Sequence, residues 1–265
     1  MLYDAHCHLQ DLRLARAGFE PAALRETGLK RAVVNGTRPE DWPAVASLAA
    51  AFPDFVQPSF GLHPWWANDR PPVAWRSKLH QQLLDHPKAG IGEIGLDRWI
   101  DDFDMLAQEE AFLWQLEMAA EFDKPASIHC LKAWGRLLEL LKANQLPERG
   151  FLLHSFGGPA EMVKPLADLG AYFSFCGYFL HERKASVREA FKIVPPDRLL
   201  IETDAPDQPL PEELDEYRLT DFENGERLND PHSLDAIYEG LADVLGRPVD
   251  DLAGQIEANF LRFFD

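Results

Sequence analysis

One local pattern recurs along the chain and restricts its fold more than any other feature. A short apolar run is followed by a turn, then by a stretch with apolar residues at helical spacing, and then by the next apolar run. Several runs, such as Phe151-Leu152-Leu153, are apolar at every position, which is typical of parallel strands covered on both faces. We predict strands at 2–8, 31–35, 55–62, 90–96, 126–129, 151–154, 171–176 and 199–203.

The stretches between these runs predict helices. Helical spacing is found at 40–51, 106–122, 134–143, 160–169, 186–193, 234–245 and 249–263. Strands that alternate with helices favour a parallel α/β architecture. Because eight such units lie in 265 residues without a linker, repeat or low-complexity tract, we predict a single-domain (β/α)8 TIM barrel over residues 1–265. A doubly wound open sheet is the alternative fold.

The net charge limits the partners that the surface can bind. The chain carries 26 Lys and Arg against 44 Asp and Glu, which gives a formal charge of −18. Such a surface repels polyanions at long range and lacks the basic clusters of a broad nucleic-acid interface. A small site that handles a few phosphates through metal ions is still compatible with this charge.

Cysteine content and hydropathy indicate a reducing, aqueous setting. Three cysteines, Cys7, Cys130 and Cys176, are too few for a disulfide framework. Cys7 and Cys130 each adjoin a histidine on a predicted strand, so they face the outer core if the histidines face inward. No run approaches the roughly 18 apolar residues that span a bilayer, and the first residues have neither a basic start nor an apolar signal region. We therefore expect a cytoplasmic protein without membrane contact.

Side chains able to bind metals recur where the predicted strands end. His6 and His8 lie two apart on the first strand, so both leave the same face, and we expect Glu93 at the end of the strand that begins at Gly90. The carboxyl ends of barrel strands form the active-site face, where residues distant in sequence meet. Any one of these residues alone has a structural explanation, such as a hydrogen-bonded histidine or a turn-capping aspartate. Their joint placement predicts a metal site made of His6, His8, Glu93, His129, His154 and Asp204.

The ligand types indicate the chemistry of this site. Imidazole with carboxylate suits divalent Zn, Mn, Ni or Fe, and the absence of cysteine from the set disfavours a structural zinc knot. Six ligands exceed the need of one ion and suit two ions about 3.5–4 Å apart, bridged by a carboxylate. Such a pair activates water and polarises the bond to be cut, which serves hydrolysis of a phosphoester or an amide.

The motifs around these residues identify a family resemblance. The chain resembles the TatD family of metal-dependent deoxyribonucleases, within the amidohydrolase-like barrels, along nearly its whole length. The motifs are Asp4-Ala5-His6-Cys7-His8-Leu9, Gly61-Leu62-His63-Pro64, Gly92-Glu93-Ile94-Gly95-Leu96-Asp97, Ile128-His129, His154-Ser155-Phe156-Gly157-Gly158 and Glu202-Thr203-Asp204-Ala205-Pro206.

The resemblance implies a role for each residue of the set and two divalent ions, Zn, Mn or Mg. His6, His8 and Asp204 would hold one ion, and His129 and His154 the other. Glu93 would bridge the two ions. Asp204 and Glu93 are thus the expected catalytic residues, with Asp204 also orienting the attacking water and taking its proton. Glu202 is expected to support a ligand from behind.

Departures from the family pattern lie where substrate is expected. The family has an arginine two residues after the fifth-strand histidine, but here Leu131 stands there and Lys132 follows. An acid, Asp207, follows the eighth-strand motif where the family is apolar or aromatic. The segment of about 205–231 is an acidic insertion loop with nine acids against Arg218 and Arg227, either a lid or a solvated surface segment.

Several residues are candidates for substrate contact. His63 is expected at the edge of the site, either near substrate or as a hydrogen-bonded residue beside its proline. Trp65, Trp66 and Trp99 follow predicted strands and can stack on a base or ring, whereas Trp134 is expected to pack an outer helix. The substrate contacts that we predict are His63, Trp65, Lys132, Arg183 and Lys184.

The resulting hypothesis is a TatD-like phosphodiesterase or 3′-end exonuclease. The second hypothesis is a metal-dependent amidase, esterase or lactonase that acts on a small molecule at the same site. The third hypothesis is a barrel that binds a metal or ligand without turnover. The expected partner is a small-molecule or short nucleic-acid substrate. We expect a monomer or weak homo-oligomer with no obligate protein partner.

Overall fold

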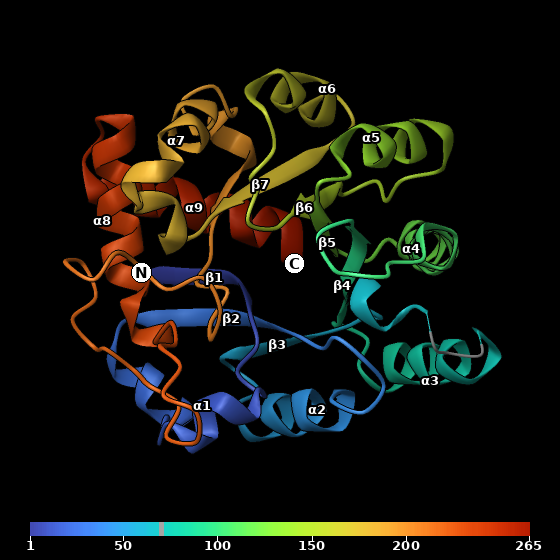
Figure 1. Ribbon diagram of the computed structural model, residues 1–265, viewed down its shortest axis with the longest axis horizontal. Helices are drawn as coiled ribbons and strands as arrows, with labels where there is room; N and C mark the ends of the chain where they lie inside the picture. Colours follow the sequence, from blue (N-terminus) through green and yellow to red (C-terminus); the bar gives the residue numbers. More distant parts are fainter. Residues whose placement is uncertain (69–71) are drawn as a thin grey trace.

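The strands form one parallel sheet that runs in chain order around the molecule (Figure 1). The computed structural model describes residues 1–68 and 72–265, and within these residues the sheet has eight strands. The order never reverses, so the doubly wound alternative is wrong and the predicted barrel is confirmed. The strands are β1 (Leu2–Cys7), β2 (Leu29–Asn35), β3 (Val56–Phe60), β4 (Gly90–Asp97), β5 (Ala126–Leu131), β6 (Phe151–Leu153), β7 (Ala171–Phe175) and β8 (Leu199–Ile201).

Helices follow most strands and surround the sheet (Figure 1). They are α1 (Leu12–Arg16), α2 (Trp42–Ala51), α3 (Pro72–Asp85), α4 (Met105–Glu121), α5 (Trp134–Ala143), α6 (Val163–Ala167), α7 (Ala185–Phe191), α8 (Leu234–Leu245) and α9 (Val249–Phe264). The sequence prediction omitted α1 and α3, although buried Trp75, Leu79 and Leu83 recur in α3 at the four-residue spacing of a helix. Among the described residues, no helix is both long and apolar enough to cross a membrane.

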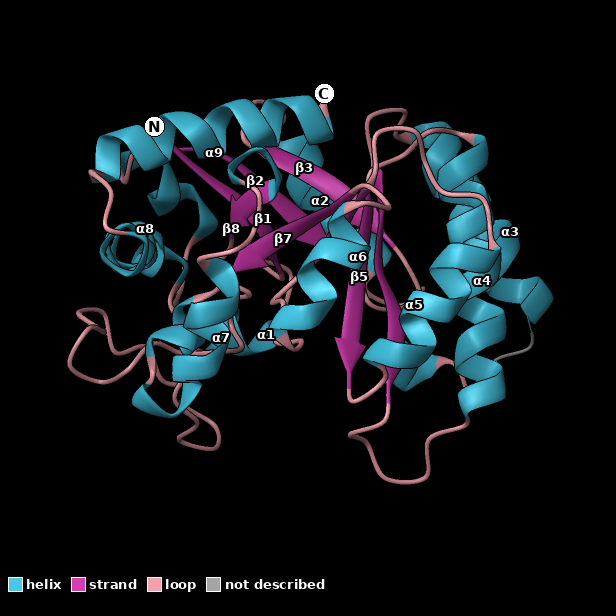
Figure 2. Cartoon of the chain, turned by 90° about the horizontal axis from the view of Figure 1, so that it is seen from above, coloured by secondary structure: helices cyan, strands magenta, loops and turns pink. Residues whose placement is uncertain are grey.

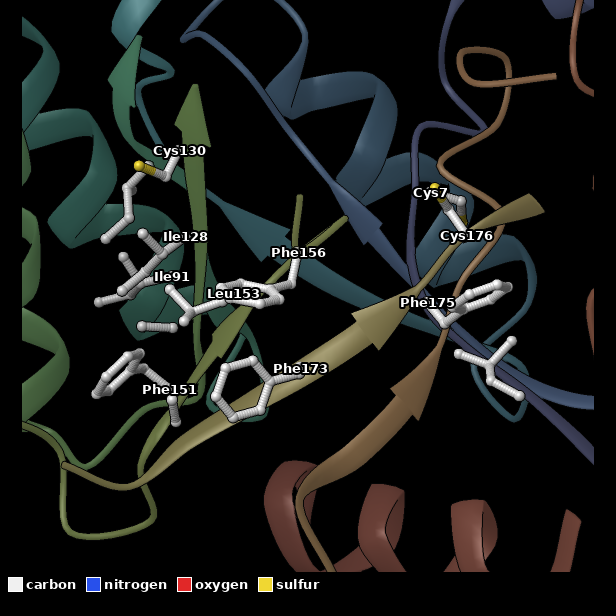
Figure 3. Close-up of a cluster of buried hydrophobic side chains, with 14 of the residues drawn as sticks. Cys7, Ile91, Ile128, Cys130, Phe151, Leu153, Phe156, Phe173, Phe175 and Cys176 are labelled. Atoms are coloured by element: carbon white, nitrogen blue, oxygen red, sulfur yellow. The ribbon is translucent and has the colours of Figure 1, made fainter. Parts of the chain in front are cut away.

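The larger apolar cluster lies between the sheet and the helices around it (Figure 3). Phe151 and Leu153, at alternate positions of β6, belong to this cluster. The free thiols of Cys7, Cys130 and Cys176 are buried in it as well, which confirms the outer-core position predicted for the first two. Burial raises the pKa of all three thiols, so they are packing groups rather than nucleophiles.

A second cluster fills the end of the barrel at which the strands begin. Figure 2 shows α9 lying across this end. The ring of Phe260 lies 4.8 Å from that of Tyr3, and the ring of Phe263 lies 4.6 Å from that of Tyr172. Both phenylalanines are fully buried. Because α9 fills this end, the side chains at the opposite, carboxyl end are the ones that face a cavity.

Hydrogen bonds between β1 and the segment after β8 close the barrel. The backbone N–H of Asp204 donates to the carbonyl of His6 at 3.0 Å. The N–H of His8 donates to the carbonyl of Ala205 at 2.8 Å. The first strand is thereby joined to the last.

Two buried side chains complete this seam. The hydroxyl of Tyr238, on α8, accepts from the N–H of Tyr3 and donates to its carbonyl, both at 3.0 Å. The carboxylate of Asp4 accepts from the N–H and the hydroxyl of Thr203 at 3.0 and 2.6 Å. Buried backbone groups need such partners, so these contacts stabilise the closed barrel.

Replacement of Tyr238 by Phe tests the seam. Tyr238→Phe leaves both backbone groups of Tyr3 buried without this partner, and we expect the free energy of unfolding to fall by about 1–3 kcal/mol. Urea unfolding followed by circular dichroism measures the loss. Tyr217→Phe is the control, because Tyr217 is 45% exposed, and its expected change is within about 0.5 kcal/mol. Equal changes in the two variants would contradict this account of the seam.

Candidate metal centre

The carboxyl ends of the strands bring five of the six predicted ligands to the lining of one cavity of about 780 Å³, and the sixth, His6, is fully buried beside His8. His6 lies within β1 and His8 directly after it, while His154 directly follows β6. His129 lies in β5, and Asp204 follows β8. The residues of the predicted set that line the cavity are His8, Glu93, His129, His154 and Asp204.

The predicted position of Glu93 at the end of its strand is wrong. β4 continues to Asp97, so Glu93 lies inside it. The pairing of β4 with β5 shifts register between Ile91 and Ile94, and this irregularity turns Glu93 into the site. Gly95 permits β4 to approach β5 closely at His129, because it has a φ of +145° and a Cβ there would lie 2.0 Å from the carbonyl oxygen of His129.

The first group of ligand atoms lies between β1, β4 and the segment after β8. The Nε2 atoms of His6 and His8 are 3.2 Å apart. They lie 3.5 and 3.3 Å from Oε2 of Glu93. Both Nε2 atoms also lie 3.6 Å from Oδ1 of Asp204. Four ligand atoms on buried side chains therefore face one point.

The second group uses the other oxygen of the same glutamate. Oε1 of Glu93 lies 3.0 Å from Nδ1 of His129 and 2.8 Å from Nε2 of His154. These two nitrogens are 3.2 Å apart. Glu93 thus offers one carboxylate oxygen to each group.

The spacing of these atoms fits divalent ions. Four ligands placed tetrahedrally about 2.0–2.1 Å from a zinc ion lie about 3.3–3.4 Å from each other. The separations in the first group, 3.2–3.6 Å, match this value closely, and those in the second group are slightly shorter at 2.8–3.2 Å. The histidine and carboxylate donors also match the ligands that zinc and manganese accept.

The second ring nitrogen of most of these histidines is anchored. Nδ1 of His8 donates to the carbonyl of Asn35 at 2.8 Å, which leaves Nε2 as the metal-facing lone pair. Nδ1 of His6 lies 2.7 Å from the hydroxyl of Ser127. Nε2 of His129 lies 3.1 Å from Oδ2 of Asp97. Such partners fix the ring orientation and raise the basicity of a ligand.

Glu202 lies behind the site, as expected for a support. Its Oε1 accepts from the N–H and hydroxyl of Ser155 at 2.6 and 2.7 Å, and its Oε2 accepts from the hydroxyl of Ser174 at 2.5 Å. Oε1 also lies 3.6 Å from Nδ1 of His154. His6, His154 and Glu202 also form a group with metal-compatible spacing. The carboxylate of Glu202, however, already accepts the three hydrogen bonds from Ser155 and Ser174.

His63, Glu93 and His129 form another group with metal-compatible spacing, but the hydrogen bonds of His63 favour a donor role over metal binding. Its Nδ1 accepts from the N–H of Trp65 at 3.2 Å, so the neutral ring carries its proton on Nε2. Nε2 lies 3.2 Å from Oε1 of Glu93. Burial lowers the pKa of His63 to about 4, which keeps the ring neutral. The site therefore contains one neutral imidazole N–H beside the second ligand group.

The electric field of the Glu93 and Asp204 carboxylates favours positive charge in the site. Burial would raise the pKa of Glu93, but the charge of His154 and hydrogen bonds from His129 and His154 hold it well below its usual range. Burial would lower the pKa of His8, yet hydrogen bonds to Asp204 and Glu93 raise it well above its ordinary value. The same negative potential attracts a divalent cation.

Gln208 is a site residue that the sequence prediction missed. Its Nε2 donates to Oδ2 of Asp204 at 3.0 Å and to the hydroxyl of Ser155 at 2.9 Å. Its Oε1 accepts from the thiol of Cys176 at 3.3 Å. Gln208 thus holds the Asp204 carboxylate with Oδ1 toward the first group. The only sequence signal was its place four residues after Asp204.

The predicted substrate contacts fall into two sets. His63 and Trp65 line the cavity. Lys132, Arg183 and Lys184 are not among its lining residues in the described part of the chain, but each covers an aromatic ring that is. Lys132 lies over Trp99, and Arg183 and Lys184 lie over Tyr178. Trp134 begins α5, and its ring centroid lies 4.8 Å from that of Phe156 in the segment after β6.

The acidic loop is docked onto the barrel through arginines. Arg13 of α1 donates to both oxygens of Asp207 at 2.9 and 2.8 Å. Arg16 of the same helix pairs with Asp221 at 2.5 Å, and Asp221 is fully buried. Asp215 is also buried and pairs with Arg227 at 2.6 Å. Arginines of α1 and of the loop itself therefore hold it in place and neutralise part of its charge. Asp207 and Gln208 line the cavity, whereas most residues between 212 and 226 are exposed.

Comparisons with known proteins extend over the whole chain. The family model for TatD-related DNases matches residues 3–265. A 3′-5′ ssDNA/RNA exonuclease TatD from Edwardsiella piscicida is 34% identical over 70% of this chain and 71% of its own length. A protein of the same name from Erwinia tasmaniensis is 30% identical over 91% of this chain and 90% of its own.

A solved structure agrees with these relatives. The crystal structure of YjjV, a TatD homologue from Escherichia coli K12, superposes with a TM-score of 0.83. It is 27% identical and the match covers 99% of this chain and 97% of that one.

Replacement of Asp97 by Asn tests the second ligand group. The variant removes the negative charge that anchors His129, and we expect the affinity for one of two Zn²⁺ or Mn²⁺ ions to fall about 10- to 100-fold. Isothermal titration calorimetry with elemental analysis measures both sites. Asp221→Asn, at a fully buried carboxylate paired with Arg16, is the matched control and should bind both ions normally. A wild-type protein that binds no divalent ion would refute the metal centre.

Proposed function

The chain belongs to the family of TatD-related DNases and is a metal-dependent hydrolase, and we propose that it cleaves phosphodiester bonds at the 3′ end of single-stranded DNA or RNA with two divalent ions. The relatives named as 3′-5′ ssDNA/RNA exonucleases support this substrate. The ligands come from β1 through to the segment after β8, so we propose that residues 1–265 act as one catalytic unit.

One observation carries the proposal: the two oxygens of Glu93 face two different groups of ligand atoms. His6, His8 and Asp204 would hold one ion, and His129 and His154 would hold the other. A carboxylate that faces ligands on both sides suits a pair of ions about 3.5–4 Å apart, which is the spacing found in two-metal hydrolases. Zn, Mn and Mg are the candidate ions.

Protein side chains around the ions divide the remaining tasks. Two ions bound there would supply an activated water and Lewis-acid polarisation of the phosphodiester. Asp204 accepts the proton of the attacking water, because its carboxylate lies beside the first group and is held by Gln208. His63 remains neutral and offers its Nε2 proton to an oxygen of the substrate or product.

The cavity is compatible with a short chain end. Its volume of about 780 Å³ lies in the upper part of the range of about 300–1,000 Å³ that is usual for ligand pockets. The arginine pairs of Asp207, Asp215 and Asp221 reduce the repulsion that the acidic loop exerts on phosphates. A strand end that enters the cavity therefore meets a partly neutralised wall.

Replacement of Asp204 by Asn tests the proposed chemistry. Asn cannot take a proton, and we expect kcat on a 5′-labelled single-stranded oligonucleotide to fall about 10²- to 10⁴-fold. Gel analysis of product length gives the rate, and elemental analysis checks that ions remain bound. Asp243→Asn is the control, because Asp243 is exposed on α8, and it should retain full activity.

Hydrolysis of other bonds is the outcome that would replace this proposal. A wild-type protein that binds both ions, leaves oligonucleotides intact and hydrolyses amide, ester or lactone substrates would be a small-molecule hydrolase. Loss of that activity in Asp204→Asn would then assign it to the same site.

Variants of Gln208 test whether the orientation of Asp204 matters. Gln208→Met keeps the approximate shape but removes the N–H donor, and we expect kcat to fall about tenfold with KM unchanged. Gln208→Glu places a second carboxylate against Asp204 and should lower kcat further. Steady-state kinetics at a fixed metal load distinguish the two variants. Equal activity in wild type, Gln208→Met and Gln208→Glu would show that this hydrogen bond has no catalytic effect.

A further inference from the structure

Two tryptophans with unusually exposed rings form one wall of the cavity. Trp65 follows β3 and is 52% exposed, while Trp99 follows β4 and is 65% exposed. Both line the cavity that contains the proposed metal ligands. Indole side chains of folded proteins are highly buried on average, and exposed rings beside a binding site provide faces on which planar groups stack.

A single buried carboxylate ties both tryptophans to the metal centre. Oδ2 of Asp97 accepts from the indole N–H of Trp65 at 2.6 Å, and Oδ1 accepts from the backbone N–H of Trp99, also at 2.6 Å. The same Oδ2 lies 3.1 Å from Nε2 of His129. Asp97 is fully buried. Asp97 therefore fixes the ring of Trp65 and the backbone of Trp99 relative to the second ligand group.

Further contacts hold the two loops together. The side-chain amide of Asn68 donates to the carbonyl of Asp102 at 3.1 Å and its oxygen accepts from the N–H of Asp104 at 3.3 Å. Gln108 of α4 pairs with the backbone N–H and carbonyl of Asp97 at 2.8 and 2.9 Å. The loop that carries Trp99 is thus braced against the one that carries Trp65.

One cation lies over the ring of Trp99, and another lies over Trp66, next to Trp65 in the sequence. The ammonium of Lys132 lies 3.8 Å from the centroid of Trp99. Arg38, which also lines the cavity, lies 4.1 Å over the ring of Trp66. Aromatic faces alternating with cations are the elements with which proteins hold unpaired nucleotides, through base stacking and phosphate neutralisation.

We propose that Trp65 and Trp99 form a stacking subsite for the nucleobases next to the scissile phosphate, and that Asp97 is a positioning residue that keeps this subsite in register with His129. The inference rests on the proposed function, because it takes a strand end as the substrate. Bases within a duplex are stacked on each other and cannot use these faces, so the subsite selects unpaired ends.

Binding measured without turnover separates this inference from the proposed function. Asp204→Asn serves as the background, so that a 5′-fluorescein tetrathymidylate stays intact during anisotropy titration. Trp65→Leu and Trp99→Leu should each raise its Kd between about 5- and 150-fold, the range for the loss of one stacked base. Trp65→Phe keeps an aromatic face without the indole N–H and should retain most of the affinity.

An oligonucleotide whose two 3′-terminal residues are abasic gives the decisive comparison. This oligonucleotide keeps the phosphates but lacks two bases. Its Kd for the Asp204→Asn protein should therefore equal the Kd of tetrathymidylate for the same protein carrying both Trp65→Leu and Trp99→Leu. The double variant should bind both oligonucleotides equally. Phe122→Leu is the control, because this 43% exposed ring lies where α4 ends, at the other end of the barrel, and it should change neither Kd.

The results have distinct meanings. The stacking subsite would be overturned if the tryptophan variants lost affinity equally for thymidine and abasic ends, or if they lost no affinity at all. If the predicted binding pattern holds but the protein with intact Asp204 cleaves neither oligonucleotide, the subsite stands and the proposed nuclease activity fails.

Discussion

The hydrogen bonds between β1 and the segment after β8 are the contacts on which the metal centre depends. His6 and His8 come from the first strand and Asp204 from beyond the last, so the first ligand group exists only when the barrel is closed. The backbone bonds across the seam involve these same residues, and Tyr238 and Asp4 reinforce them. Fold stability and ligand geometry are therefore set by one set of contacts, which a parallel barrel provides because all its strands end at the same face.

The charge of the chain has different effects at different distances. At long range the excess of acidic residues repels nucleic acid. Close to the cavity, Arg13 and Arg16 bind acids of the loop after β8, and Lys132 and Arg38 lie over aromatic rings. Under the proposed function, association with a polyanion would rely on short-range stacking and on metal ions more than on long-range steering, which would favour a short strand end over a long duplex.

Sequence reasoning identified the barrel and the six convergent side chains because both follow from strand periodicity. It placed Glu93 at a strand end, since periodicity carries no sign of the register shift that turns this residue inward from the middle of β4. It overlooked Asp97 and Gln208, whose importance comes from tertiary hydrogen bonds to His129 and Asp204. The partners of the acidic loop lie about two hundred residues away in α1, a pairing that no local pattern predicts.

The contact of Tyr3 with α9 and α8 has a consequence for the protein as it is synthesised. Tyr3 leaves the ribosome 235 residues before its backbone partner Tyr238, and its ring partner Phe260 follows later still. β1 can pair with β2 early, but its other edge waits until the segment after β8 and α8 have been translated. A nascent chain thus holds His6 and His8 without Asp204, and the first ligand group becomes complete only after β8 has been made.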